Sequence, residues 1–134
     1  MRHRLPAILI LVLPLLGSAP ARAHHSPTAV FDMEHRFSLS GTLTKVDWIN
    51  PHIEVYLDAK KGDGSVENWK FESNPPSWFR RVGLAREDIA KALGQTVTVE
   101  GVRAKAGGLY GYLLKITLPD GNSLELEFKP GNGQ

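Results

Sequence analysis

The segment 41–58, GTLTKVDWINPHIEVYLD, restricts the fold most, because aliphatic, aromatic and β-branched residues lie on both sides of an Asn-Pro corner. After the corner, Ile53, Val55 and Leu57 share one face of an extended chain, since successive strand side chains point to opposite sides. Before the corner the alternation slips, and a bulge near Thr44-Lys45 would restore it. The segment therefore predicts two strands joined at a tight corner, the first curled as in small barrels.

Further strand signals predict a small barrel. The expected strands are residues 37–48, 53–58, 66–72, 95–103, 112–118 and 123–129. A helix is expected at 85–93, ended by Gly94, after a short helical turn that begins at Ser77. Three strands, a helix and two or three more strands is the order of an OB-fold. We therefore predict an all-β fold with one short helix, an OB-like Greek-key barrel, and keep a β-sandwich as the alternative.

The predicted core consists of the apolar residues on the inward faces of these strands. They are Leu43, Trp48, Ile53, Val55, Leu57, Phe71, Val97, Val99, Leu114, Ile116, Leu124 and Leu126.

The first 23 residues are typical of a secretory signal peptide. Arg2 and Arg4 precede an apolar run at 5–16, and Ala21-Arg22-Ala23 fits the small-x-small cleavage pattern. The run is shorter than the roughly 20 residues that a membrane span needs, so a retained anchor is the less favoured alternative. We predict a signal peptide at 1–23, an N-terminal arm at 24–36 held by Val30 and Phe31, a barrel domain at 37–129 and a frayed tail at 130–134. The expected location is the periplasm.

Charge and cysteine usage restrict the partners. The first 23 residues carry three arginines and no acidic residue, so cleavage lowers the formal net charge from +2 to −1. A nearly neutral domain has no electrostatic footprint for nucleic acid. The chain has no cysteine, which excludes disulfides and thiolate metal sites. After cleavage we expect no membrane contact and no nucleic-acid partner, and a metal ion or another periplasmic protein are the candidate partners.

Several short motifs point to a family. They are His24-His25-Ser26 after the signal peptide, Phe31-Asp32, the WINPH run at 48–52 and the GQTV phrase at 94–97. With these motifs the chain resembles a family of small exported bacterial proteins of unknown function, over essentially the whole mature sequence. The resemblance implies bacterial export and a compact β fold, and it supplies no catalytic residue.

Histidines are the candidate metal ligands. Cleavage after Ala23 would make His24 the first residue, whose α-amine and imidazole Nδ1 can chelate one ion. Nitrogen ligands of this kind favour copper(II). His52, on a strand beside the proline corner, is the preferred third ligand, followed by His35 and His25. The alternatives are that the first histidines are merely solvated, and that His52 caps the corner by donating to a backbone carbonyl.

Weaker groups complete the copper hypothesis. Asp32 and Glu34 are candidate axial or supporting groups. Cleavage before Ala23 would place His25 third in the chain, where it would bind copper locally without any fold.

An aromatic and basic segment suggests a second function. Trp78, Arg80 and Arg81 follow the Pro-Pro pair, and such a surface grips an anionic ligand or a partner peptide. The alternative is that the aromatic residues fill the barrel while the arginines are solvated. Since the chain has no nucleophile motif or phosphate loop, we expect a binding protein rather than an enzyme. A small copper redox enzyme is the third possibility.

Overall fold

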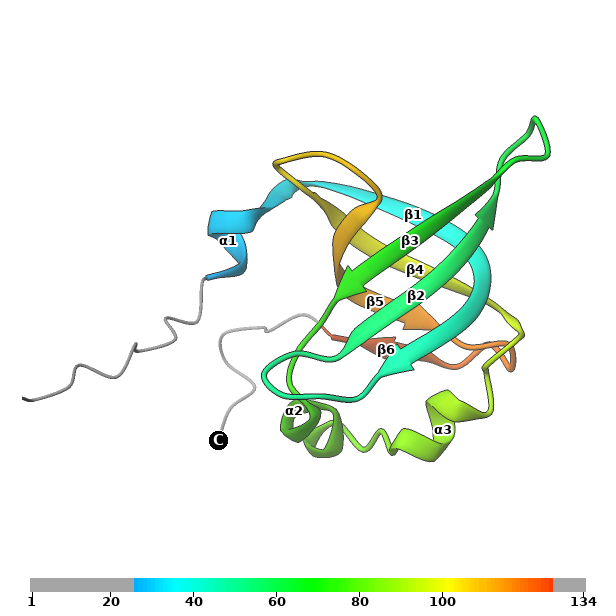
Figure 1. The fold of residues 1–134 in the computed structure, drawn as a ribbon. Helices are drawn as coiled ribbons and strands as arrows, with labels where there is room; N and C mark the ends of the chain where they lie inside the picture. The colour runs from blue at the N-terminus through cyan, green and yellow to red at the C-terminus, as the bar shows by residue number, and fades with distance from the viewer. Residues whose placement is uncertain (1–25, 127–134) are drawn as a thin grey trace, which may run out of the picture.

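A computed structural model describes residues 26–126 as six strands and three short helices (Figure 1). The helices are α1 (Pro27–Val30), α2 (Pro76–Arg81) and α3 (Arg86–Ala90). The strands are β1 (Phe31–Asp47), β2 (Glu54–Lys60), β3 (Val66–Glu72), β4 (Thr96–Ala104), β5 (Tyr110–Thr117) and β6 (Ser123–Glu125). No helix within residues 26–126 is long and apolar enough to cross a membrane.

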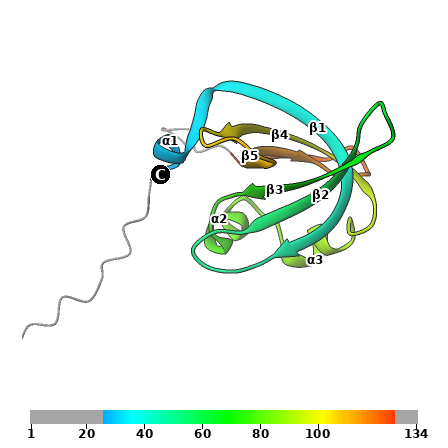
Figure 2. The ribbon, with the colours of Figure 1, turned by 45° about the horizontal axis from the view of Figure 1, so that its top comes forward.

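The sheet closes into a barrel, which confirms the predicted fold class over the sandwich. Its strand order is β3-β2-β1-β4-β5-β6, and a parallel pairing of β3 with β5 closes the first five of these strands into a ring. The long strand β1 curves around the barrel and pairs with both β2 and β4 (Figures 1 and 2). Strand β6 extends the sheet beyond the closed ring of five strands.

The predicted bulge and corner are both present. The pairing of β1 with β2 shifts register between Leu43 and Lys45, which places the bulge where the slipped alternation predicted it. The chain then bends at Asn50-Pro51, and this peptide bond is cis. The bulge lets β1 pair with both β2 and β4, because it increases the local twist and bend of the strand.

Most of the predicted core lies inside the barrel. Trp48 and Leu124 are only half-buried at its rim, whereas Leu114 belongs to a second cluster outside it. The cause is a register shift in the β4–β5 ladder, where Gly101 pairs with Leu113 although the neighbouring Glu100 pairs with Lys115. This bulge turns Leu114 outward, so a strict alternation along β5 assigned it to the wrong face.

Two short helices close the lower end of the barrel in Figure 1. Helix α2 lies where a helical turn was expected, and α3 lies within the predicted helix. Phe79 of α2 and Ile89 of α3 are fully buried there together with Leu84. Helix α3 is shorter than the predicted 85–93, and Leu93 lies beyond its end and is exposed. The plug is therefore built from single turns whose apolar residues point up into the barrel.

The predicted N-terminal arm is ordered structure from residue 27 onward. Helix α1 comes first, and β1 begins at Phe31, six residues earlier than predicted. Phe31 is buried against Val102, Ala104, Tyr112 and Leu114, which form the second hydrophobic cluster. These contacts fasten the start of the described chain to the outside of β4 and β5. The predicted signal peptide and the frayed tail lie outside the described residues.

Candidate functional site

The start of β1 carries a wide bulge that we call the Asp32–His35 bulge. Phe31 pairs with Ala104, and the next paired residue, Arg36, lies opposite Val102. Four residues on β1 are thus looped out against one on β4. Bulges of this kind re-aim side chains and are over-represented beside functional sites.

The bulge presents one hydrogen-bonded acid and histidine pair to solvent. His35 Nδ1 lies 2.8 Å from Asp32 Oδ2, and the two side chains are 81% and 42% exposed. A second oxygen of Asp32 accepts the backbone N–H of Glu34 at 3.3 Å. Met33 turns the other way and packs against the second hydrophobic cluster. Burial of Phe31 and Met33 therefore leaves the polar residues of the segment facing outward.

The Asp32–His35 contact shifts the pKa of both side chains. The hydrogen bond from His35 lowers the pKa of Asp32, and the same bond to Asp32 raises the pKa of His35 above its ordinary value. The two shifts favour an imidazolium and carboxylate pair. The stability that His35 contributes to the fold is fully present below its ordinary pKa and is lost as the pH rises through the raised pKa. The stability that Asp32 contributes is present above its ordinary pKa and is lost as the pH falls through its lowered pKa.

We expect the Asp32→Asn variant to lower the pKa of His35 toward its ordinary value, because the amide removes the negative charge that favours the imidazolium. An NMR titration of the His35 ring protons, followed in wild type and variant, measures the change. His52 in the same spectra is the internal control. Identical His35 titration curves in both proteins would show that the pair does not form in solution.

The bulge is adjacent to the N-terminal end of the described chain. Lys105, in the β4–β5 turn, donates from Nζ to the carbonyl of Thr28 at 2.8 Å and from its backbone to that of Val30 at 2.9 Å. Figure 2 shows α1 beside this turn. Because α1 begins only three residues after His24, the chain enters the fold at this corner. His24 and His25 themselves lie outside the described residues.

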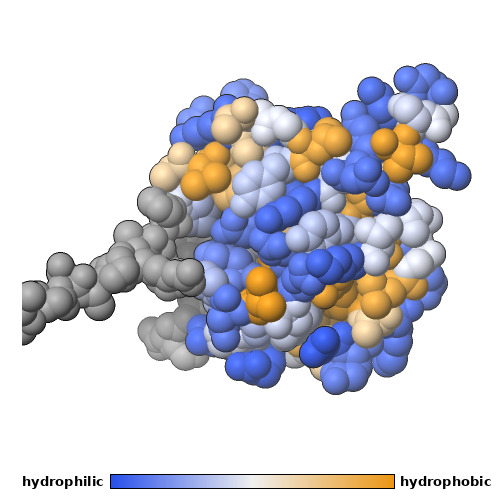
Figure 3. All heavy atoms as spheres, in the orientation of Figure 1, coloured by the Kyte–Doolittle hydropathy of each residue, from blue (hydrophilic) through white to orange (hydrophobic). Residues whose placement is uncertain are grey.

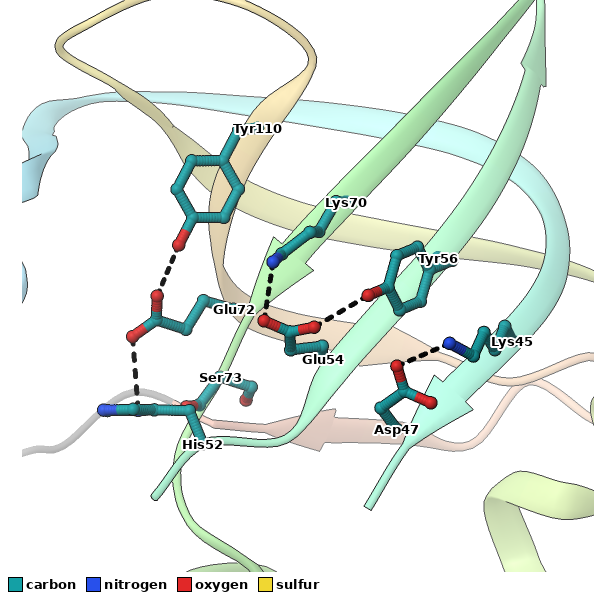
Figure 4. A network of polar contacts seen from close by, with 9 residues as sticks. All are labelled: Lys45, Asp47, His52, Glu54, Tyr56, Lys70, Glu72, Ser73 and Tyr110. Carbon is teal, nitrogen blue, oxygen red and sulfur yellow. Dashed lines mark hydrogen bonds and ion pairs between the residues drawn. The ribbon is translucent and has the colours of Figure 1, made fainter. Parts of the chain in front are cut away.

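His52 is held at a different place. Its Nδ1 lies 2.9 Å from the carbonyl oxygen of Ser73 and 3.3 Å from Glu72 Oε1 (Figure 4). A carbonyl can only accept, so Nδ1 donates, which is the capping contact that the sequence offered as an alternative. Strands β4 and β5 lie between the start of β1, where His35 sits, and the end of β3 beside His52. The structure therefore does not bring the two histidines together.

His52 is part of a polar network on the outer face of β2 and β3 (Figure 4). Glu54 and Glu72 are paired directly across the two strands, where like charges repel. Lys70 Nζ contacts Glu54 at 2.6 Å and the Tyr56 hydroxyl donates to it at 2.7 Å. Burial acts to raise the pKa of Glu54, but the bonds from Lys70 and Tyr56 outweigh it and lower the pKa. Lys70 and Tyr56 therefore offset the negative charge of Glu54 within the network.

The second glutamate is compensated by different groups. The Tyr110 hydroxyl on β5 donates to Glu72, whose other oxygen faces His52. Burial and the bond to Glu72 raise the pKa of Tyr110, while the bond to Glu54 raises that of Tyr56. This network was not predicted from the sequence. Its only local signal was the polar alternation of residues 52–58, because the matching groups come from β3 and β5.

The aromatic and basic segment is divided between the core and the surface. Phe79 is fully buried, whereas Trp78 is half-buried and meets the Phe79 ring edge-on at 6.1 Å between centroids. Arg80 and Arg81 are exposed in the last turn of α2. An arginine that the sequence did not single out, Arg103, lies 4.6 Å above the ring centres of both Phe37 and Trp69. What remains at the surface is one tryptophan edge and two arginines.

An open groove of about 640 Å³ lies between α3 and the β5–β6 turn. Leu84, Ala92, Leu118 and Leu124 line it together with polar residues of the rim. Among residues 26–126, no histidine lines it, and the acids on its rim bond to neighbours within their own turns, as Asp120 does with Asn122. The groove is therefore separate from His35 and His52, the candidate histidine ligands in this range.

Within residues 26–126, no three metal-binding side chains are grouped so that they could hold an ion by themselves. The Asp32–His35 pair has two such groups and the His52–Glu72 pair has two. A complete metal site at either place would need a ligand from outside the described range.

Comparison with known proteins identifies a family. The sequence model of a family of unknown function, DUF6152, matches residues 13–113, which is most of the chain. No curated protein and no solved structure matches the chain. The chain therefore belongs to DUF6152, a family of unknown function.

Proposed function

We propose that this chain is an exported periplasmic protein that binds one copper(II) ion between its mature N-terminus and the Asp32–His35 bulge. The observation that supports this best is the position of the His35–Asp32 pair. It lies exposed on the strand that directly follows α1, close to where the mature chain would begin.

The donor set suits copper. A first residue His24 supplies the α-amine and the imidazole Nδ1, and His35 supplies a third nitrogen from Nε2. Copper(II) stands highest among the divalent first-row metals for nitrogen sites of this kind. His35 already donates from Nδ1 to a carboxylate, which is how most metal-ligating histidines are oriented. In this proposal Asp32 is the orienting group and Glu34 a further acid at the edge of the site.

In this proposal His35 replaces His52 as the third copper ligand. His52 was the preferred third ligand, but β4 and β5 separate it from the bulge and its Nδ1 bonds to Ser73. His35 takes its place, and His25 is the neighbouring ligand if cleavage occurs one residue earlier. Trp78, Arg80 and Arg81 have no part in the metal site.

Protons compete with copper for the same nitrogens. The ligands must be deprotonated to bind, and the pKa of His35 is raised by Asp32. Copper affinity should therefore fall as the pH drops through the raised pKa of His35.

The decisive experiment titrates copper(II) into protein whose intact mass shows that it begins at His24. A matched protein with one extra N-terminal glycine keeps every histidine but moves the amine out of the chelate. We expect the extra glycine and the His35→Ala substitution each to weaken binding by at least about tenfold, the lower end of the loss seen for orienting groups. His52→Ala is the control and should leave the affinity unchanged.

Three results would contradict the proposal. Equal affinities for the processed and the glycine-extended protein would exclude the amine as a ligand. A loss caused by His52→Ala and not by His35→Ala would move the site to the polar network. Periplasmic protein that begins at Met1 would exclude the cleavage on which the site depends.

A further inference from the structure

Apolar side chains gather at the rim of the barrel around Trp48, just after the end of β1. A small pocket of about 100 Å³ lies there between β1 and α3 and is lined by Val46, Trp48, Arg86, Ile89, Ala90 and Leu93. Two apolar neighbours are left in solvent, Ile49 at 53% and Leu93 at 44% exposure. Figure 3 shows apolar surface gathered beside the lower end of β1, over α3. We call this set of residues the Trp48 patch.

Folding alone does not account for the patch. The Trp48 ring meets the buried Phe79 ring edge-on at 5.3 Å, so one side of the indole completes the core. Trp48 also lines the pocket together with Leu93, which lies three residues after the end of α3. Exposed apolar clusters rimmed by polar residues mark interaction sites more often than single exposed side chains do.

The pocket wall carries one basic side chain. Arg86 lines the pocket, and the neighbouring helix α2 carries Arg80 and Arg81 exposed in its last turn. The nearby acids are largely engaged elsewhere, since Asp47 contacts Lys45. Asp88 likewise bonds to the Ala85 amide and to Lys91, which leaves Glu87 as the exposed acid beside Arg86.

We infer that the Trp48 patch binds a partner protein that presents one apolar side chain flanked by carboxylates. A pocket of this size accepts a single side chain, and tryptophan and arginine dominate the binding energy of protein interfaces. Arg86 in the pocket wall supplies the complementary charge for acidic residues beside the anchor. The inference is independent of the copper site, because neither His35 nor Asp32 lines the pocket.

A protein partner fits better than a lipid surface. Trp48 forms the wall of a concave pocket rather than projecting from the fold, so it can enclose a discrete side chain but cannot insert into a headgroup layer. Anionic vesicles are therefore the competing arm of the test.

The test uses two synthetic peptides, Glu-Asp-Leu-Asp-Glu and the same peptide with serine in place of leucine. Each is titrated into the isotope-labelled full chain while NMR follows the Trp48 indole N–H and the Leu93 amide. We expect saturable shifts of both signals with the leucine peptide, and binding weaker by at least about tenfold for the serine peptide. Arg86→Glu should weaken the leucine peptide to a similar degree. Lys60→Glu changes the same charge on the β2–β3 hairpin and should have no effect.

Three outcomes would overturn the inference. Absence of shifts with the leucine peptide at millimolar concentration would show that the pocket takes no side chain. Equal binding of the two peptides, or equal losses from Arg86→Glu and Lys60→Glu, would show non-specific attraction. Shifts of Trp48 with phosphatidylglycerol vesicles but not with peptide would assign the patch to a membrane surface.

Discussion

Gly111→Ala is expected to lower the free energy of unfolding by about 3 kcal/mol, at the upper end of the usual cost of overpacking. A Cβ at Gly111 would lie 2.8 Å from the Val102 carbonyl oxygen and 2.9 Å from Cε1 of Phe71. The carbonyl belongs to the β4–β5 ladder, and the Phe71 ring is fully buried in the core. Neither group can move without breaking other contacts, so the strain falls on the closure of the barrel.

Gly62→Ala is the matched control for this prediction. Gly62 lies in the β2–β3 turn, where a Cβ would meet no atom within 4 Å. The same added methyl group should change the stability by no more than about 0.5 kcal/mol. Urea unfolding followed by tryptophan fluorescence gives both values. Similar midpoints for the two variants would show that β4 and β5 are not as closely packed as described.

Phe31→Ala is expected to cost about 3–5 kcal/mol of stability, the usual range for truncating a buried phenylalanine. The ring is 1% exposed and lies 5.2 Å from the Tyr110 ring and 5.3 Å from the Tyr112 ring. If the proposed function is correct, the variant should also bind copper more weakly by about tenfold. The reason is that Phe31 fastens the bulge and α1 to the barrel, so its loss frees the ligands from one another.

Phe79→Ala separates these two effects. Phe79 is also fully buried, but it lies in α2 at the opposite end of the barrel from α1. It should cost a comparable amount of stability and leave the copper affinity of the folded protein unchanged. The measurement is copper titration at a temperature where both variants are folded. Equal losses of affinity would mean that Phe31 acts only through global stability.

Sequence periodicity predicted the barrel well wherever one strand face is buried. The bulge at Leu43–Lys45 and the buried set Ile53, Val55 and Leu57 follow from local alternation, because a slip of one residue would expose every apolar side chain. The same reasoning failed for Leu114. Leu114 points outward because the pairing of β5 with β4 shifts register beside it. That shift depends on residues of β4, so the sequence of β5 alone does not predict it.

The candidate site was predictable only as a set of residue types. Histidines near the expected mature N-terminus and beside the proline corner were evident from the sequence. Their preferred combination, His24 with His52, stays a prediction, because His24 lies outside the described residues. The pairing of His35 with Asp32 depends on a bulge between Phe31 and Arg36, which arises because these two residues pair with β4 at unequal spacing.

By itself, the sequence determined the fold class, the succession of strands along the chain and the inward faces of most strands. The reason is that burial of one strand face imposes a period of two on the apolar residues. Tertiary structure alone decided which polar groups meet. Glu72 receives Tyr110 from another strand, and His52 is directed to Ser73 at the end of β3. It also decided that His35 and His52 lie apart, with β4 and β5 between them. These outcomes depend on strand register and barrel closure, which are set by contacts between residues far apart in the chain.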